Sequence, residues 1–123
     1  MRATDFFSKI EQLARGDYLG EFELMVLLAV IRLEDDAYGV TISREIEERS
    51  GREVSLGSVY AALERMEEKG LVTSRLGDPT AARGGRAKRF FRATSDGIGS
   101  ARGTQKALVN LWRGLPQLDG GRA

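Results

Sequence analysis

The sequence predicts a mainly α-helical fold that carries a single β-hairpin. Apolar residues recur at helical spacing in five segments, which lie on both sides of residues 71–93. Within 71–93, two short runs of branched and aromatic residues flank a glycine-rich stretch, a pattern typical of two strands and their turn. The 123 residues are 41% hydrophobic and 30% charged, which suits one globular domain with a modest core.

The first predicted helix lies within residues 1–17. Thr4 can cap it, Gly16 can end it, and its apolar residues are Phe6, Phe7, Ile10 and Leu13. The second predicted helix, 20–33, is apolar on nearly every side, so we expect it to be the central buried helix. A buried strand is the alternative for this run, but its length and the flanking Glu21 and Glu23 favour a helix.

The next two helices are short and well delimited. Tyr38-Gly39 opens a helix over 40–50, which Gly51 ends, and 52–54 form a link or a single β-bridge. Ser55 is a good N-cap for the following helix, and Gly70 supplies its left-handed end. One face of this helix carries Leu56, Val59, Leu63 and Met66. We expect the acidic residues on its other sides to face away or to pair with Arg65 and Lys69.

The hairpin comprises strands over 71–76 and 87–93 with a tip at 77–86. Thr94 caps a last helix over 95–114, which Pro116 ends. Gly97, Gly99 and Gly103 each disfavour that helix by roughly 1 kcal/mol relative to alanine, so packing must hold it. The apolar edge of this helix consists of Ile98, Ala101, Leu108, Leu111, Trp112 and Leu115.

Three helices followed by a hairpin form the winged helix-turn-helix arrangement. In this arrangement the three helices are 20–33, 40–50 and the one that follows Ser55, and the start of the last of them faces a DNA major groove. Small residues there allow close approach and hydroxyls can bond phosphates or base edges; the residues are Ser55, Gly57, Ser58 and Ala61. Ser55 and Ser58 could instead only satisfy local bonds at the helix start. We therefore expect a DNA-binding domain over 18–94, with 1–17 and 95–115 as dimerisation helices and 116–123 as a flexible tail.

Charge is distributed unevenly although the net charge is only +1. Residues 34–53 contain seven acids and three bases, whereas 83–92 contain five bases and no acid. Such a strip is the footprint expected of a DNA-binding wing, although a solvated surface loop would have the same composition. The bases are Arg83, Arg86, Lys88, Arg89 and Arg92.

Composition excludes several function classes. The chain has no cysteine and no histidine, so it lacks thiolate chemistry, the commonest metal ligands and the commonest general base. We expect no metal site, no cofactor and no enzymatic activity. The longest apolar run, 24–31, is far shorter than the roughly 20 residues that span a bilayer. Charges throughout the N-terminal residues argue against a signal peptide and predict a cytoplasmic protein.

Two stretches resemble the PadR family of bacterial transcriptional regulators. They are SLGSVYAALERMEEKGLV, the stretch of the recognition helix, and GGRAKRFFRATSDG, the stretch of the wing. LGEFELMVLLAVIRLEDDAYGVTI is similar to the family's first two helices, including the Tyr-Gly pair. The similarity runs from about Leu19 to Leu115. Ala87 stands where the family often has proline, and Ala93 where it has a larger aliphatic residue.

The resemblance implies a homodimer, clasped through the terminal helices, that binds a pseudo-palindromic operator in double-stranded DNA, usually as a repressor. It also implies that Tyr60 meets the DNA backbone together with Arg83, Arg86, Lys88 and Arg89. Tyr38 could either lie near a phosphate or cover the acidic turn. Trp112 would anchor the dimer interface or stack on a flat aromatic effector. The alternative function is a winged-helix module that binds only protein.

Overall fold

The computed structural model describes residues 18–78 and 87–118. The predicted helix within 1–17, including Phe6, Phe7, Ile10 and Leu13, lies outside the described residues, as do most of the hairpin tip and the end of the tail. The elements follow in the order α2 (Glu21–Leu33), the 3-10 helix η1 (Glu34–Asp36), α3 (Gly39–Ser50), α4 (Leu56–Glu68), β1 (Val72–Leu76), β2 (Arg89–Ala93) and α5 (Ser95–Trp112). This order confirms the predicted mainly α fold with a hairpin.

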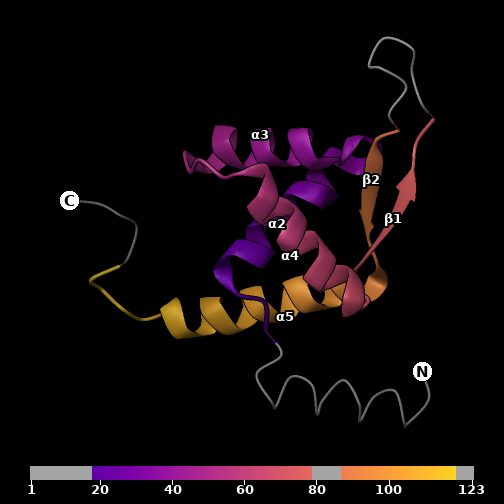
Figure 1. Ribbon diagram of the computed structural model, residues 1–123. Helices are drawn as coiled ribbons and strands as arrows, with labels where there is room; N and C mark the ends of the chain where they lie inside the picture. The colour runs from indigo at the N-terminus through magenta and orange to yellow at the C-terminus, as the bar shows by residue number, and fades with distance from the viewer. Residues whose placement is uncertain (1–17, 79–86, 119–123) are drawn as a thin grey trace, which may run out of the picture.

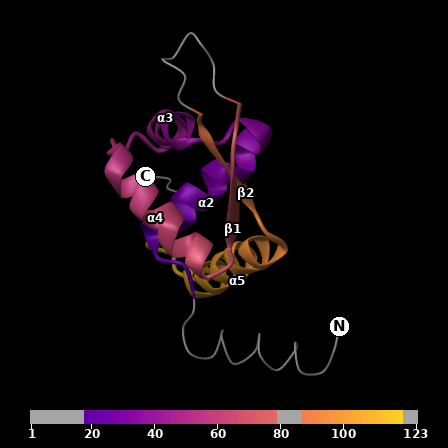
Figure 2. The same ribbon diagram turned by 45° about the vertical axis from the view of Figure 1, so that its right-hand side comes forward.

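The core lies between α2, α3, α4 and the hairpin. Helices α3 and α5 lie at opposite ends of the domain, with α2 and α4 between them and the two strands along one side (Figures 1 and 2). The largest side chains buried at this junction include Leu27, Ile42, Leu63 and Met66. Leu63 and Met66 come from the apolar face that the sequence predicts for their helix.

Two predictions about helix faces are wrong. Helix α2 is not buried on every side, because Leu28 and Ile31 lie on a stripe that none of the described elements covers and are 46% and 38% exposed. Leu56 does not share the buried face of Val59 and Leu63. It is the first residue of α4, beyond the edge of the helix packing, and is 44% exposed.

The hairpin is antiparallel, with Val72 opposite Ala93 and Leu76 opposite Arg89. The Phe91 N–H also donates to the Ala37 carbonyl at 2.8 Å, so the segment after η1 lies beside β2 as a further backbone partner. The bridge considered for 52–54 does not form, since this segment follows α3 without any strand pairing. The sequence gave no means of identifying Ala37 as the backbone partner of β2, because the two segments lie far apart in the chain.

Helix ends follow the predicted capping chemistry. The Ser55 Oγ accepts from the Ser58 N–H, and the Thr94 Oγ1 accepts from the Gly97 N–H. Gly51 and Gly70 both have φ of 76°, the left-handed conformation that glycine adopts most easily. At Gly70, the next N–H, that of Leu71, donates to the Met66 carbonyl and closes the helix. The turn at Gly70 sets the angle between α4 and β1.

Helix α5 packs along its first half and projects beyond the domain along its second half. Ala101 and Thr104 are buried, and the Thr104 Oγ1 accepts a hydrogen bond from the Leu19 N–H at 3.1 Å. Arg113 then leaves the helix with ψ of 143°, so α5 ends at Trp112, before the predicted stop at Pro116. Within the described residues, no helix is long and apolar enough to cross a membrane.

Candidate nucleic-acid interface

The start of α4 forms an exposed surface of small and hydroxyl-bearing residues. Ser55, Gly57, Ser58 and Ala61 all lie at the surface. A side chain added at Gly57 would meet no atom within 4 Å, so the backbone there is open to close approach. The two serines do form the local bonds considered above, because the Ser55 Oγ donates to the Ser58 Oγ at 2.9 Å. Both hydroxyls nevertheless remain at the surface, where each oxygen can accept from a further donor.

Tyr60 extends from α4 to the first turn of α3. Its ring packs over Gly39, and a Cβ at residue 39 would lie only 2.6 Å from the Tyr60 Cζ. The Tyr60 side chain is 37% exposed, with its hydroxyl at the N-terminal end of α3. Because Gly39 has no side chain, the Tyr60 ring of α4 can pack directly against the first turn of α3.

Tyr38 precedes α3 and contacts the hairpin. The Lys88 Nζ lies 4.3 Å from the centre of the Tyr38 ring, and the Phe90 ring meets Tyr38 edge-on with centroids 5.5 Å apart. The acidic turn is closed by another residue, since the Thr41 Oγ1 donates to the Asp36 carbonyl at 2.6 Å. The same Thr41 oxygen accepts from the Tyr38 N–H at 3.0 Å. Tyr38 thus joins the start of α3 to β2.

Alternation along β2 sends the basic side chains to two faces of the hairpin. Lys88 contacts Tyr38 on the face toward α3. Arg89 faces α4, where its Nε donates to the Ser74 Oγ at 3.0 Å and its Nη2 lies 4.0 Å from Glu67. The Ser74 hydroxyl in turn donates to the Glu67 carboxylate at 2.7 Å. Arg83 and Arg86 lie outside the described residues.

Of the two arrangements considered for the acidic residues of α4, Glu64 and Glu68 face away at the surface, while Arg65 and Lys69 pair with another helix. The Arg65 Nε donates to Glu23 of α2 at 2.9 Å, and the Lys69 Nζ lies 3.7 Å from the same carboxylate. Glu67 is directed to the hairpin instead. These pairs hold α4 against α2 and the hairpin at the end far from Ser55. At the opposite end, Ser55, Gly57 and Ser58 remain exposed.

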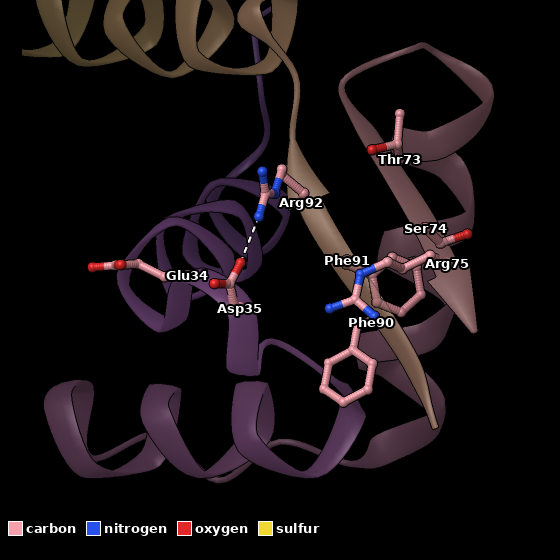
Figure 3. A pocket seen from close by; sticks show the side chains of 8 residues that line it. All are labelled: Glu34, Asp35, Thr73, Ser74, Arg75, Phe90, Phe91 and Arg92. Carbon is pink, nitrogen blue, oxygen red and sulfur yellow. Dashed lines mark hydrogen bonds and ion pairs between the residues drawn. The ribbon is translucent and has the colours of Figure 1, made fainter. Parts of the chain in front are cut away.

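A cavity of about 320 Å³ opens between η1 and the hairpin (Figure 3). Arg92 and Asp35 point toward each other across it and form an exposed ion pair. Its wall also includes Phe90, whose ring is covered by the Arg75 guanidinium at 4.8 Å. Arg92 is the one base of the predicted wing, among those described, that lines this cavity; neither the residues at the start of α4 nor Trp112 line it. Sequence reasoning missed the Asp35–Arg92 pair because 57 residues separate its members.

The second half of α5 exposes large apolar side chains. Leu108 is 53% exposed, Leu111 75% and Trp112 57%, and Leu115 follows just beyond the helix end at 41%. These are the described members of the predicted dimer interface. Across residues 18–78 and 87–118, no group of acidic side chains is arranged to hold a metal ion.

Comparisons with known proteins agree on one family. Residues 27–102 match the transcriptional regulator PadR-like family. A PadR family transcription regulator from Clostridium difficile R20291 is 22% identical with a TM-score of 0.65, covering 80% of this chain and 97% of that one. A PadR family transcriptional regulator from Eggerthella lenta DSM 2243 is 21% identical with a TM-score of 0.63, covering 97% of this chain and 96% of that one. No curated protein sequence matches the chain.

Proposed function

The chain belongs to the PadR-like family of transcriptional regulators, and we propose that it represses transcription by binding a pseudo-palindromic DNA operator as a homodimer. The observation that carries this proposal is the chemistry of the first turns of α4. Exposed small and hydroxyl residues lead a helix that is buried along one face and ion-paired to α2 near its other end. A helix held in this way can enter a major groove with its N-terminal turn first.

In this proposal, base readout and backbone contact fall on different residues. Ser58, Gly57 and Ala61 approach the base edges, since they are the small exposed residues of the helix. Tyr60 packs on Gly39, and Lys88 lies over the ring of Tyr38. We propose that both side chains contact DNA phosphates. Arg83, Arg86 and Arg89 add the remaining wing bases. The N–H groups at the start of α4 favour a phosphate as well.

The homodimer is proposed from the projecting half of α5. Exposed apolar side chains at Leu108, Leu111 and Trp112 form a patch that a second copy would cover. A two-fold axis near this helix places two recognition helices on one duplex, as a pseudo-palindrome requires. Phe6, Phe7, Ile10 and Leu13 are proposed to extend the same interface.

Selection of bound sequences from random duplex DNA tests the proposal most directly. We expect enrichment of two related half-sites with inverted symmetry, separated by a multiple of about 10 base pairs. Enrichment of a single half-site would contradict the dimer, and an absence of binding to any duplex would favour the protein-interaction module. A slope of about −0.9 in log K against log salt is expected for each neutralised phosphate.

A matched pair of variants separates readout from backbone contact. Ser58→Ala is expected to change the preferred sequence, with a discrimination change of about 1–3 kcal/mol at the base pair concerned. The double variant Arg86→Ala/Lys88→Ala is expected to weaken specific and random DNA alike and to reduce the salt slope. Operator and random duplexes are titrated side by side by fluorescence anisotropy. Equal loss of affinity for both duplexes with Ser58→Ala would remove this serine from readout.

An effector site at the dimer interface is a separate part of the proposal. Trp112 is the only tryptophan of the chain, so its fluorescence reports any flat aromatic compound that stacks there. We expect a bound effector to quench the Trp112 fluorescence and to lower the affinity of the protein for its operator. Unchanged fluorescence across a panel of planar aromatic compounds would leave Trp112 as an interface anchor only.

A further inference from the structure

Four side chains form a continuous stack between the start of α3 and the hairpin. Lys88 lies over one side of the Tyr38 ring, and Phe90 meets Tyr38 at 72° between ring planes. Arg75 lies over the Phe90 ring from the paired strand. We refer to Lys88, Tyr38, Phe90 and Arg75 as the aromatic stack. Cation–π and edge-to-face contacts of this kind are directional, so they fix angles as well as distances.

The two aromatic members of the stack are held by the residues around them. Gly77 leaves room for the Phe90 ring, since a Cβ at residue 77 would lie 2.6 Å from the Phe90 Cε2. On the other side, the Tyr38 N–H is bound by the Thr41 hydroxyl, and the next residue, Gly39, supports the Tyr60 ring of α4. The stack therefore links the hairpin to the recognition helix through the Tyr38-Gly39 pair.

We infer that Tyr38 is a positioning residue whose ring, rather than its hydroxyl, holds Lys88 in the orientation from which it contacts a DNA phosphate. The inference rests on the proposed DNA-binding function. Lys88 lies one residue from the end of the described part of the wing, and its ammonium group is placed over an aromatic face instead of ranging freely in solvent. Without that ring, the flexible lysine stem would sample many rotamers, and ordering it on DNA would lower the affinity.

Salt-dependent binding to the selected operator tests the inference. The variants are Tyr38→Phe, Tyr38→Ala, Lys88→Ala and the double variant Tyr38→Ala/Lys88→Ala. We expect Tyr38→Ala to weaken binding about two- to fivefold, the factor that corresponds to an exposed cation–π contact. Its salt slope should fall toward that of Lys88→Ala, by up to about 0.9. The double variant should bind no more weakly than Lys88→Ala alone, because both changes remove the same contact.

The conservative variant separates the ring from the hydroxyl. Tyr38→Phe keeps the aromatic face, so we expect its affinity and salt slope to match those of the natural protein. If Tyr38→Phe loses as much affinity as Tyr38→Ala, the hydroxyl contacts DNA and the inference is wrong. If Tyr38→Ala leaves the salt slope unchanged, Lys88 does not depend on Tyr38 and the inference is equally wrong.

Two controls exclude loss of folding and an unrelated aromatic effect. Partial unfolding would lower the concentration of active protein without changing the salt slope. Phe90→Leu keeps Tyr38 but removes its edge contact, so it should reduce the salt slope as Tyr38→Ala does. Tyr18→Ala is the matched control. Tyr18 is exposed, and it precedes Leu19, whose N–H donates to Thr104 of α5, at the end of the domain opposite α3. If the natural protein binds no DNA, the proposed function itself fails. If it binds and the Tyr38 variants equal it, only the present inference fails.

Discussion

Helices α4 and α5 begin alike and end in opposite environments. Both start at a hydroxyl cap, Ser55 or Thr94, that accepts from an N–H three residues later. Helix α4 then exposes small and polar residues at its start and is packed along its remaining turns. Helix α5 is packed at its start and exposes large apolar residues at its end.

The difference shows how one helical domain can present two kinds of surface. Small exposed residues and surface hydroxyl groups suit the hydrated, polar edges of DNA bases. Large exposed apolar residues suit another protein surface, because covering them removes apolar area from water. The buried residues of each helix, including Val59 and Met66 in α4 and Ala101 and Thr104 in α5, hold the exposed residues in place. Substitutions in the two helices should therefore separate stability, assembly and DNA binding.

The largest expected effect is at the buried side of α4. Leu63→Ala removes a fully buried side chain and should lower the free energy of unfolding by about 2–5 kcal/mol. Leu56→Ala, on the exposed side of the same helix, should change it by less than about 0.5 kcal/mol. Urea denaturation at one protein concentration measures both. Equal effects would mean that the first turn of α4 is packed as tightly as its middle.

The exposed end of α5 should determine assembly. In the proposed dimer, Trp112→Ala removes a central aromatic anchor and should weaken association by about 2 kcal/mol, a roughly 30-fold rise in the dimer dissociation constant. Lys106→Ala, at an exposed polar position on the same helix, is the control. Analytical ultracentrifugation over a dilution series gives both constants. A natural protein that is monomeric at all concentrations would remove the interface proposed for α5.

Gly97 marks the packed end of α5. A Cβ at this residue would overlap the Leu71 carbonyl, which belongs to the backbone and cannot rotate away. We expect Gly97→Ala to lower the free energy of unfolding by about 1–3 kcal/mol through forced separation of α5 and the start of β1. Thermal unfolding monitored by circular dichroism is the measurement. A neutral effect would show that α5 can move outward without loss of packing.

The smallest effect is expected two residues later. Gly99 has no atom within 4 Å of the Cβ position, so Gly99→Ala meets no obstacle. Alanine should raise the free energy of unfolding by up to about 1 kcal/mol, because it loses less backbone freedom in a helix than glycine does. The same thermal experiment applies, with Gly97→Ala as its opposite. Destabilisation by Gly99→Ala would indicate that α5 has a further close neighbour.

The fold was largely predictable because its signals are local. Caps at Ser55 and Thr94, stops at Gly51 and Gly70, and the short strands around the glycine-rich tip all appear as the sequence predicts. The errors concern which side of a helix is covered. Leu28 and Leu56 were assigned to the core because helical periodicity cannot show where a neighbouring element ends. The serines and tyrosines at the start of α4 and α3 could be singled out by type and position, but their contacts could not.

By itself, the sequence determined the order and approximate extent of the described helices and strands, the basic character of the hairpin and the absence of cysteine and histidine chemistry. These properties depend on neighbouring residues or on composition alone. Only the tertiary structure decided that Tyr60 rests on Gly39, that Lys88 and Arg89 turn to opposite faces, and that Asp35 pairs with Arg92. Those contacts join residues far apart in the chain, and they form only after packing fixes the angle between the hairpin and the helices.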